Sequence, residues 1–215
     1  MQVIECPPTP LALPAGAIVQ VRTLRWVLPE WPGQPDDPPG LPLTWARKPA
    51  FLVGDRCMRA EFAILNQLRQ QGWHGGVWVN AFGNELRTAW FPAQGFRAPE
   101  PAGAPPWAAA VFDELRAANG GKLTGFFDVF AWREPGQIGF FEAKVGPDII
   151  RPSQRTFLET ALRFRSLDQF TIIEFGRQRR ERPARSRRAR QPGAPANAAT
   201  EQAAIEHVMG RRAGP

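Results

Sequence analysis

The sequence predicts an α/β fold in which helices flank a central mixed β-sheet. The chain has 215 residues, of which 43% are hydrophobic, and this is enough for one core with appendages. Two very apolar segments, 125–132 and 138–145, are separated by a short turn and predict a hairpin. Helical patterns precede and follow this hairpin, so helices are expected on the faces of the sheet.

Composition divides the chain into three parts. Residues 1–50 form a Pro-rich, irregular N-terminal arm, in which only 17–28 alternates well enough to predict a strand. Residues 51–176 carry the strand and helix patterns of the predicted domain. Residues 177–215 are rich in Arg, Pro and Ala and are expected to be a disordered basic tail.

The domain is predicted to begin with an amphipathic helix over 55–71, which Gly72 ends. Four apolar residues share one face of this helix: Cys57, Met58, Leu65 and Leu68. Two strands follow, over 76–81 and 86–91, on either side of the turn Phe82-Gly83-Asn84.

The second half of the domain contains the charged hairpin between two further helices. Pro106 lies at the start of a helix over 106–118, which Asn119-Gly120-Gly121 ends. After the hairpin strands, Pro152 opens a helix over 152–165, and 170–175 is a short apolar strand.

The positive charge is concentrated in the tail. The chain carries a net charge of +7, and residues 177–215 hold ten of the 27 Lys and Arg residues but only three of the 20 Asp and Glu residues. The preceding residues are therefore neutral overall. A basic tail indicates either an arm that binds phosphates or a solubilising disordered end.

Several classes of protein do not fit this sequence. Two cysteines, Cys6 and Cys57, do not make a disulfide framework, and a reducing compartment is the simpler interpretation. No segment approaches the length of a membrane span, so a soluble cytoplasmic protein is expected. His74 and His207 lie far apart, which excludes the usual zinc spacing, and neither a Walker-type loop nor a Gly-x-Ser-x-Gly elbow occurs.

Each strand of the predicted hairpin carries charge inside an apolar segment. Asp128 lies in the first strand, and Glu142 and Lys144 lie in the second. The five-residue connection 133–137 has an ordinary hairpin length, and symmetry about Pro135 places Asp128 opposite Glu142. Lys144 then shares the face of Glu142, because side chains alternate along a strand. A register slipped by one residue would move Asp128 to the other face.

Two opposed carboxylates destabilise a hairpin and raise one pKa unless a cation lies between them. A divalent metal removes this conflict, and Mg²⁺ binds through one or two carboxylates, water and phosphate oxygens. Lys144 would then orient a water or stabilise a phosphate oxygen, which suits metal-assisted phosphodiester hydrolysis. The alternative is a surface ion pair on edge strands. The continuous apolar sequence around Glu142 favours a central strand instead.

Two further polar residues lie on the apolar faces of predicted helices. Gln154, in the first turn of its helix, either donates to a neighbouring carboxylate or water, or bonds to nearby backbone. Glu61 lies on the buried face of the first helix. It is either a further metal ligand or a group that binds a metal-bound water, or it pairs with Arg25, Arg59 or another basic residue.

Together these residues resemble a known family. Asp128 followed by Glu142-Ala143-Lys144 is similar to the PD-(D/E)XK nuclease motif, in which the alanine takes the variable position. Glu61 and Gln154 match the accessory positions of that superfamily on the preceding and following helices. Over 125–175 the chain looks most like the virus-type replication-repair nuclease (VRR-NUC) branch, with a Gly-x-x-Asp strand and a Phe-x-Glu-x-Lys strand.

The resemblance implies a restriction-endonuclease-like core with a central four-stranded mixed sheet between helices. It also implies one or two Mg²⁺ or Mn²⁺ ions and hydrolysis of duplex or branched DNA. An endonuclease of DNA repair, recombination, restriction or mobile-element biology is the expected class. Asp128, Glu142 and the backbone carbonyl of Ala143 would hold the metal, with Glu61 as a further ligand.

Within the same resemblance, Lys144 would position the attacking water, supported by Gln154 and Glu61. The sequence departs from the family at Phe127, where many members have proline, and over the loop 145–154.

The tail supplies the predicted contacts with DNA, and its arginines are expected to bind phosphates. These are Arg177, Arg179, Arg180, Arg182, Arg185, Arg187, Arg188 and Arg190. A catalytically inactive module of the same fold, binding DNA or protein, is the alternative function. The arm residues Trp26, Trp31 and Trp45 would either dock on such a partner or pack on the core. The sequence leaves a homodimer open.

Overall fold

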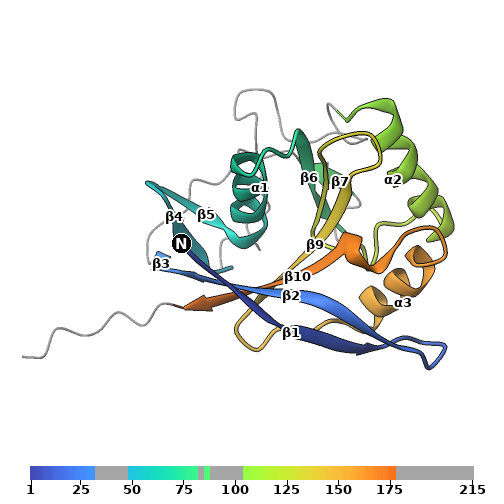
Figure 1. Cartoon of the computed structure of the whole chain (residues 1–215), viewed down its shortest axis with the longest axis horizontal. Coiled ribbons are helices and arrows are strands. Elements are labelled where there is room, and N and C mark those ends of the chain that lie inside the picture. Colours follow the sequence, from blue (N-terminus) through green and yellow to red (C-terminus); the bar gives the residue numbers. More distant parts are fainter. Residues whose placement is uncertain (32–47, 82–84, 88–103, 178–215) are drawn as a thin grey trace, which may run out of the picture. The chain divides into compact units, whose positions relative to one another are not determined.

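Seven strands form one mixed sheet in the computed structural model, which describes residues 1–31, 48–81, 85–87 and 104–177 (Figure 1). In spatial order they are β1 (Gln2–Ala12), β2 (Ile18–Leu28), β10 (Phe170–Arg177), β9 (Ile138–Val145), β8 (Val129–Trp132), β6 (Gly75–Asn80) and β7 (Glu85–Arg87).

The directions of the strands make the sheet mixed, as predicted. The pairs β7–β6, β6–β8 and β8–β9 are antiparallel, β10 runs parallel to both β9 and β2, and β1 is antiparallel to β2. The expected number of four strands is wrong, because β1, β2 and β7 extend the sheet of the described residues at its two edges.

Helices cover both faces of this sheet. Helix α1 (Ala60–Gln70) packs on one face, together with a small antiparallel sheet. Its strands are β3 (Glu30–Trp31), β4 (Ala50–Val53) and β5 (Arg56–Arg59). Helices α2 (Pro106–Ala118) and α3 (Pro152–Ala161) pack on the opposite face, and Figure 1 shows them apart from α1.

The charged hairpin occupies the centre of the sheet. Phe130 and Trp132 of β8 belong to the core under α2 and α3, whereas Val129 and Ala131 belong to the core under α1. A strand buried on both faces has a nearly continuous apolar sequence, which explains the composition of β8 and β9. The sequence-based preference for a central strand over a charged edge strand is confirmed.

The N-terminal segment carries two strands of the main sheet, where only one was predicted. β2 has the predicted position, but the prolines of β1 (Pro7, Pro8 and Pro10) argued against a strand. β1 is the outermost strand, and an edge strand tolerates proline because one side of its backbone needs no partner. Trp26 is 3% exposed and contacts Phe175 edge-on, so it packs on the core.

The first helix begins at Ala60, five residues later than its pattern predicted. Residues 56–59 instead form β5, which pairs with β4 around a turn at Gly54, where φ is +65°. Cys57 and Met58 are buried, but they lie on this strand. The apolar spacing cannot distinguish a helix from a short strand that leads directly into one, and this caused the error.

The strand predicted over 125–132 is shorter than expected, since β8 begins only at Val129 and Asp128 immediately precedes it, whereas the other described elements agree well with prediction. α2 has the predicted bounds, and α3 ends at Ala161 where 165 was expected. The last residues of the strand predicted over 86–91 and the tail beyond Arg177 lie outside the described residues, as does Trp45. None of the described helices has the length and apolarity of a membrane span.

Gly125 is expected to be essential for docking α3. Its φ is +83°, and a Cβ there would lie 2.2 Å from the carbonyl oxygen of Ser153. Gly136 has a matching φ of +82° and no atom within 4 Å of such a Cβ. Gly136→Ala should therefore lower the unfolding free energy by about 1 kcal/mol, and Gly125→Ala by about 3 kcal/mol or more. Urea denaturation measures both, and equal costs would contradict the proposed close approach.

Candidate functional site

The candidate site forms where β8 and β9 separate. The last ladder pair is Val129 with Phe141, and continuing this register by one residue places Asp128 opposite Glu142, as predicted. Beyond the last ladder pair, side-chain carboxylates instead of backbone carbonyls accept the hydrogen bonds between the two strands. The Asp128 N–H donates to Glu142 Oε2 at 3.1 Å, and the Ala143 N–H donates to Asp128 Oδ2 at 3.0 Å. Each carboxylate is thus held by the backbone of the opposite strand.

Lys144 and Gln154 hold the other oxygen of Glu142. Lys144 Nζ lies 2.8 Å from Glu142 Oε1, and Gln154 Nε2 donates to the same oxygen at 2.6 Å. Lys144 Nζ also donates to Gln154 Oε1 at 3.3 Å and lies 3.5 Å from Asp148 Oδ2. Gln154 Oε1 accepts the Arg151 N–H at 3.0 Å, which joins this network to the start of α3. Gln154 therefore makes both the carboxylate contact and the backbone contact that its position suggested.

Glu61 occupies the first turn of α1 and is 4% exposed. Its Oε1 forms an ion pair with Lys48 Nζ. One sequence-based interpretation of Glu61, an ion pair with a basic residue, is therefore present. The partner is Lys48, not Arg25 or Arg59. Arg25 pairs with Glu174 instead, at 2.7 Å.

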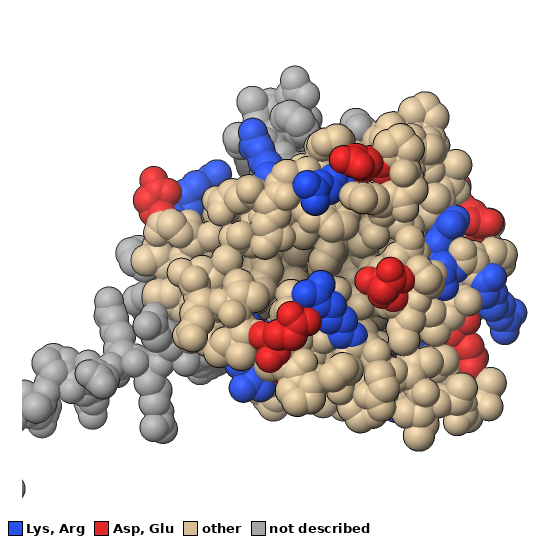
Figure 2. Space-filling model, in the orientation of Figure 1, with Lys and Arg blue, Asp and Glu red and all other residues tan. Residues whose placement is uncertain are grey.

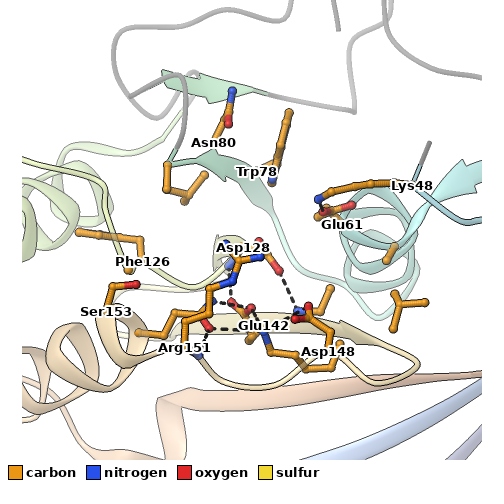
Figure 3. Close-up of a pocket in the computed structure, with 18 of the residues that line it drawn as sticks. Lys48, Glu61, Trp78, Asn80, Phe126, Asp128, Glu142, Asp148, Arg151 and Ser153 are labelled. Carbon is orange, nitrogen blue, oxygen red and sulfur yellow. Dashed lines mark hydrogen bonds and ion pairs between the residues drawn. The ribbon is translucent and has the colours of Figure 1, made fainter. Parts of the chain in front are cut away.

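One pocket of about 450 Å³ is lined by the side chains of Asp128, Glu142, Lys144, Gln154, Glu61 and Lys48. Its walls come from the first turns of α1 and α3, the end of β6, and the ends of β8 and β9 where the strands separate. Figure 3 shows Lys48 and Glu61 on one side of Asp128, and Arg151 and Ser153 on the other. The space-filling view in Figure 2 shows a hollow near the middle of this face, with acidic and basic side chains around it.

The pocket makes the ionised form of Asp128 unfavourable in the absence of a cation. Burial raises the pKa of Asp128 well above its ordinary value, and the charges of Glu142 and Glu61 raise it further, while Lys48 and the Ala143 N–H act in the opposite direction. Burial also raises the pKa of Glu142, against the lowering effect of the neighbouring ammonium and hydrogen bonds. Glu61 and Glu142 each have an ammonium partner, whereas Asp128 pairs with no cation among the described residues.

The donor set fits a hard divalent cation such as Mg²⁺ or Mn²⁺. Asp128 is only partly buried and faces the pocket beside Glu142. The Ala143 carbonyl points to the same side of β9 as the N–H that bonds Asp128, because both groups of a strand residue face one neighbour. Among the described residues, no three or more His, Cys, Asp or Glu side chains form a metal-binding group. Mg²⁺ needs only one or two carboxylates, with water and phosphate as further ligands.

Comparison with known proteins adds no relative: no protein-family model, curated protein or solved structure matches this chain. The resemblance to PD-(D/E)XK nucleases therefore stays a prediction, and the function has to be argued from the pocket.

Sequence reasoning missed several residues of the pocket. Asn80 ends the fully buried strand β6 and is itself 2% exposed. A polar residue at the end of an apolar segment could have indicated this pocket residue from the sequence. Arg151 and Asp148 lie in the loop before α3, where neither belongs to a helical or strand pattern. Lys48 belongs to no pattern, and nothing in the sequence indicates its contact with Glu61.

Asp128→Asn is expected to stabilise the metal-free protein at neutral pH. The folded state raises the pKa of Asp128, so it binds this proton more tightly than the unfolded chain does. Stability therefore falls as the pH rises above the unfolded pKa of about 3.9. An amide removes this cost and keeps an oxygen for the Ala143 N–H. With a chelator at pH 7, the melting temperature should rise by about 2–4 °C, the shift that about 1 kcal/mol produces at this size. The difference should vanish near pH 3.

Asp148→Asn is the matched control, since the Asp148 side chain is 41% exposed in the same pocket. Its melting temperature should stay close to that of the wild type. Added Mn²⁺ should raise the melting temperature of the wild type but not that of Asp128→Asn, because a ligand stabilises only the state that binds it. An Asp128→Asn protein less stable than the wild type in chelator would refute the electrostatic explanation.

Proposed function

We propose that this protein is a metal-dependent nuclease that hydrolyses DNA phosphodiester bonds in the pocket between α1 and α3. One observation carries the proposal: Asp128 and Glu142 face each other across the separating strands, and Lys144 lies 2.8 Å from Glu142. Holding two carboxylates side by side destabilises a fold, and perturbed carboxyl groups in a cleft are typical of functional sites.

The fold supports the resemblance to the PD-(D/E)XK superfamily. Strands β6, β8, β9 and β10 are four adjacent strands of mixed direction, covered by α1 on one face and α3 on the other. Glu142 belongs to one middle strand of this set, β9, Asp128 immediately precedes the other, β8, and Glu61 and Gln154 come from the first turns of the helices. We therefore place the chain in this superfamily as a proposal, with the VRR-NUC branch as the nearest resemblance.

Asp128, Glu142 and the Ala143 carbonyl would hold Mg²⁺ or Mn²⁺, which neutralises phosphate charge and acts as a Lewis acid when bound. Lys144, whose Nζ lies between Glu142 and Asp148, would donate a hydrogen bond that orients the attacking water. A bond forms from the water oxygen to phosphorus as the water releases a proton to solvent, the bond from phosphorus to the leaving sugar oxygen breaks, and that oxygen takes up a proton from solvent. Hydrolysis needs no oxidant or reductant.

Gln154 acts as a positioning residue in this scheme. Its amide nitrogen bonds Glu142, and its amide oxygen bonds both Lys144 and the N-cap backbone of α3. One side chain thereby fixes the carboxylate, the ammonium and the helix start relative to one another. The first turns of α1 and α3 also face the pocket, and the partial positive charge of helix N-termini favours a bound phosphate.

Cleavage assays test this proposal directly. Linear, flapped and branched DNA should be cut in the presence of Mg²⁺ or Mn²⁺. Asp128→Ala and Lys144→Ala should each lower the rate by about 100-fold or more, the usual cost of removing a group that stabilises transition-state charge. Lys122→Met removes an exposed lysine outside the pocket and should cleave normally. Cleavage that survives both pocket substitutions rules out this site. Binding of metal and DNA without any cleavage would support the inactive module instead.

The Arg-rich tail remains a predicted DNA-binding element that lies outside the described residues. The preceding body carries no net charge, so long-range attraction to DNA should come from the tail. Strand β10 ends at Arg177, so removal of 181–215 leaves it intact. The DNA affinity of this truncated chain should depend less steeply on salt than that of the full chain. The slope of the logarithm of the binding constant against the logarithm of the salt concentration should become shallower by about 0.9 for each lost phosphate contact. Fluorescence anisotropy measures the slope, and an unchanged slope would exclude a role for the tail.

A further inference from the structure

A second pocket, of about 600 Å³, adjoins the candidate site. Lys144 and Asp148 line both pockets, and Figure 3 shows Asp148 in the first one. In the sheet, Glu174 of β10 is the register partner of both Lys144 on β9 and Arg25 on β2, and all three line the second pocket. The second pocket therefore continues the candidate site across the sheet, away from β8 and toward β1.

One cationic side chain of the second pocket has no anionic partner. Asp148 pairs with Lys144 at 3.5 Å, and Glu174 pairs with Arg25 at 2.7 Å, so the two carboxylates of this pocket are already occupied. Arg155 of α3 is partly buried in the same pocket. Its guanidinium makes no ion pair or hydrogen bond with any described residue, and even its buried Nε has no acceptor. The positive charge of Arg155 is therefore available to a ligand.

We propose that the second pocket binds the nucleotide next to the scissile phosphodiester: Arg155 binds the phosphate of that nucleotide, while Ile149 and Pro10 contact its sugar and base. This inference rests on the proposed nuclease function and adds a substrate subsite to it. Strand β1 supplies one wall of the subsite and lies outside the four strands that carry the family resemblance. The resemblance therefore does not imply the subsite.

The position of Arg155 is the first argument for a phosphate of the same DNA strand. A guanidinium presents its donors in a planar fork that matches phosphate oxygens. Arg155 directly follows Gln154, which bonds Glu142 and Lys144 in the first pocket. Neighbouring residues of one helix thus serve the two pockets, and the helix fixes the distance between them. A strand whose scissile phosphate lies in the first pocket would place an adjacent phosphate toward Arg155.

The apolar walls are the second argument, because they indicate a nucleotide and not a bare anion. Ile149, in the loop between β9 and α3, is 70% exposed, and Pro10 is exposed on the side of β1. Leu11, Ile150 and Ile172 lie behind them. Pockets for small ligands are mainly apolar, hold roughly 300–1,000 Å³ and use a few polar groups to orient the ligand. A volume of about 600 Å³ with one available guanidinium fits this description.

Neutral phosphate analogues test the contact of Arg155 in the full chain. In a DNA substrate that the wild type cleaves, the phosphates on either side of the cut are replaced one at a time by methylphosphonate. At one position the kcat/KM of the wild type should fall about 10-fold. Arg155→Met should lose about as much on unmodified DNA, and the two changes together should cost no more than either alone, since they remove the same contact.

Arg163→Met is the matched control, because Arg163 is exposed, follows the end of α3 and lines neither pocket. It should cleave unmodified DNA like the wild type and remain sensitive to methylphosphonate. Additive losses for Arg155→Met at every position would overturn the subsite. So would a wild type that tolerates methylphosphonate at every neighbouring position, and this result does not depend on how well any variant folds.

An abasic nucleotide tests the apolar wall in the same way. Removing the base at the sensitive position should lower the kcat/KM of the wild type about fivefold, and Ile149→Ala should lose about as much on unmodified DNA, without a further loss when both are combined. Phe164→Ala is the control, since Phe164 is 45% exposed and lines neither pocket. Equal sensitivity of Ile149→Ala and the wild type to the abasic position would show that the base lies elsewhere.

These outcomes separate the subsite from the proposed function. A wild-type chain that cleaves DNA but is insensitive to every neighbouring methylphosphonate overturns the subsite and leaves the nuclease proposal intact. A wild-type chain that cleaves no DNA with Mg²⁺ or Mn²⁺ overturns the nuclease proposal, and the subsite fails with it.

Discussion

The separation of β8 from β9 at Asp128 is the constraint on which the rest of the site depends. Backbone N–H groups inside a sheet need acceptors, and beyond Val129 the opposite strand no longer supplies carbonyl oxygens to this side of the ladder. The carboxylates of Asp128 and Glu142 accept these two N–H groups instead. The acidic side chains are therefore part of the hydrogen bonding of the sheet, and their separation is set by the strand register.

Because the carboxylates complete the sheet, their charge has to be balanced by the elements that cover it. α3 contributes Gln154, which holds both Glu142 and Lys144, while the segment before β4 contributes Lys48 to Glu61 on α1. Both arrangements place a polar first turn of a helix over the end of the sheet. Gly125 makes the first arrangement possible, since only a residue without Cβ lets the chain approach the backbone of Ser153.

The central part of the site was predictable from sequence because its geometry is local. A five-residue connection sets the register that places Asp128 opposite Glu142. Gln154 lies on the apolar face of its helix, which directs its side chain toward the sheet. The errors arose where tertiary position overrides local pattern. Prolines indicated irregular structure in β1, but the edge of a sheet tolerates them, and the apolar residues of β5 fitted helical spacing. The contact of Lys48 joins segments with no common periodicity, so only the folded chain reveals it.

The charge balance of the pocket argues against a purely structural role for these residues. A structural cluster of buried ions is normally neutralised by its own members, because an unpaired buried charge costs several kcal/mol. Here Glu61 and Glu142 have ammonium partners, and the described residues leave Asp128 with hydrogen bonds but without a cation. Asp128 is also the least buried of the three and opens to the pocket. Of these three carboxylates, the one without an ammonium partner therefore lies at the accessible position, where the proposed metal ion would stabilise its ionised form.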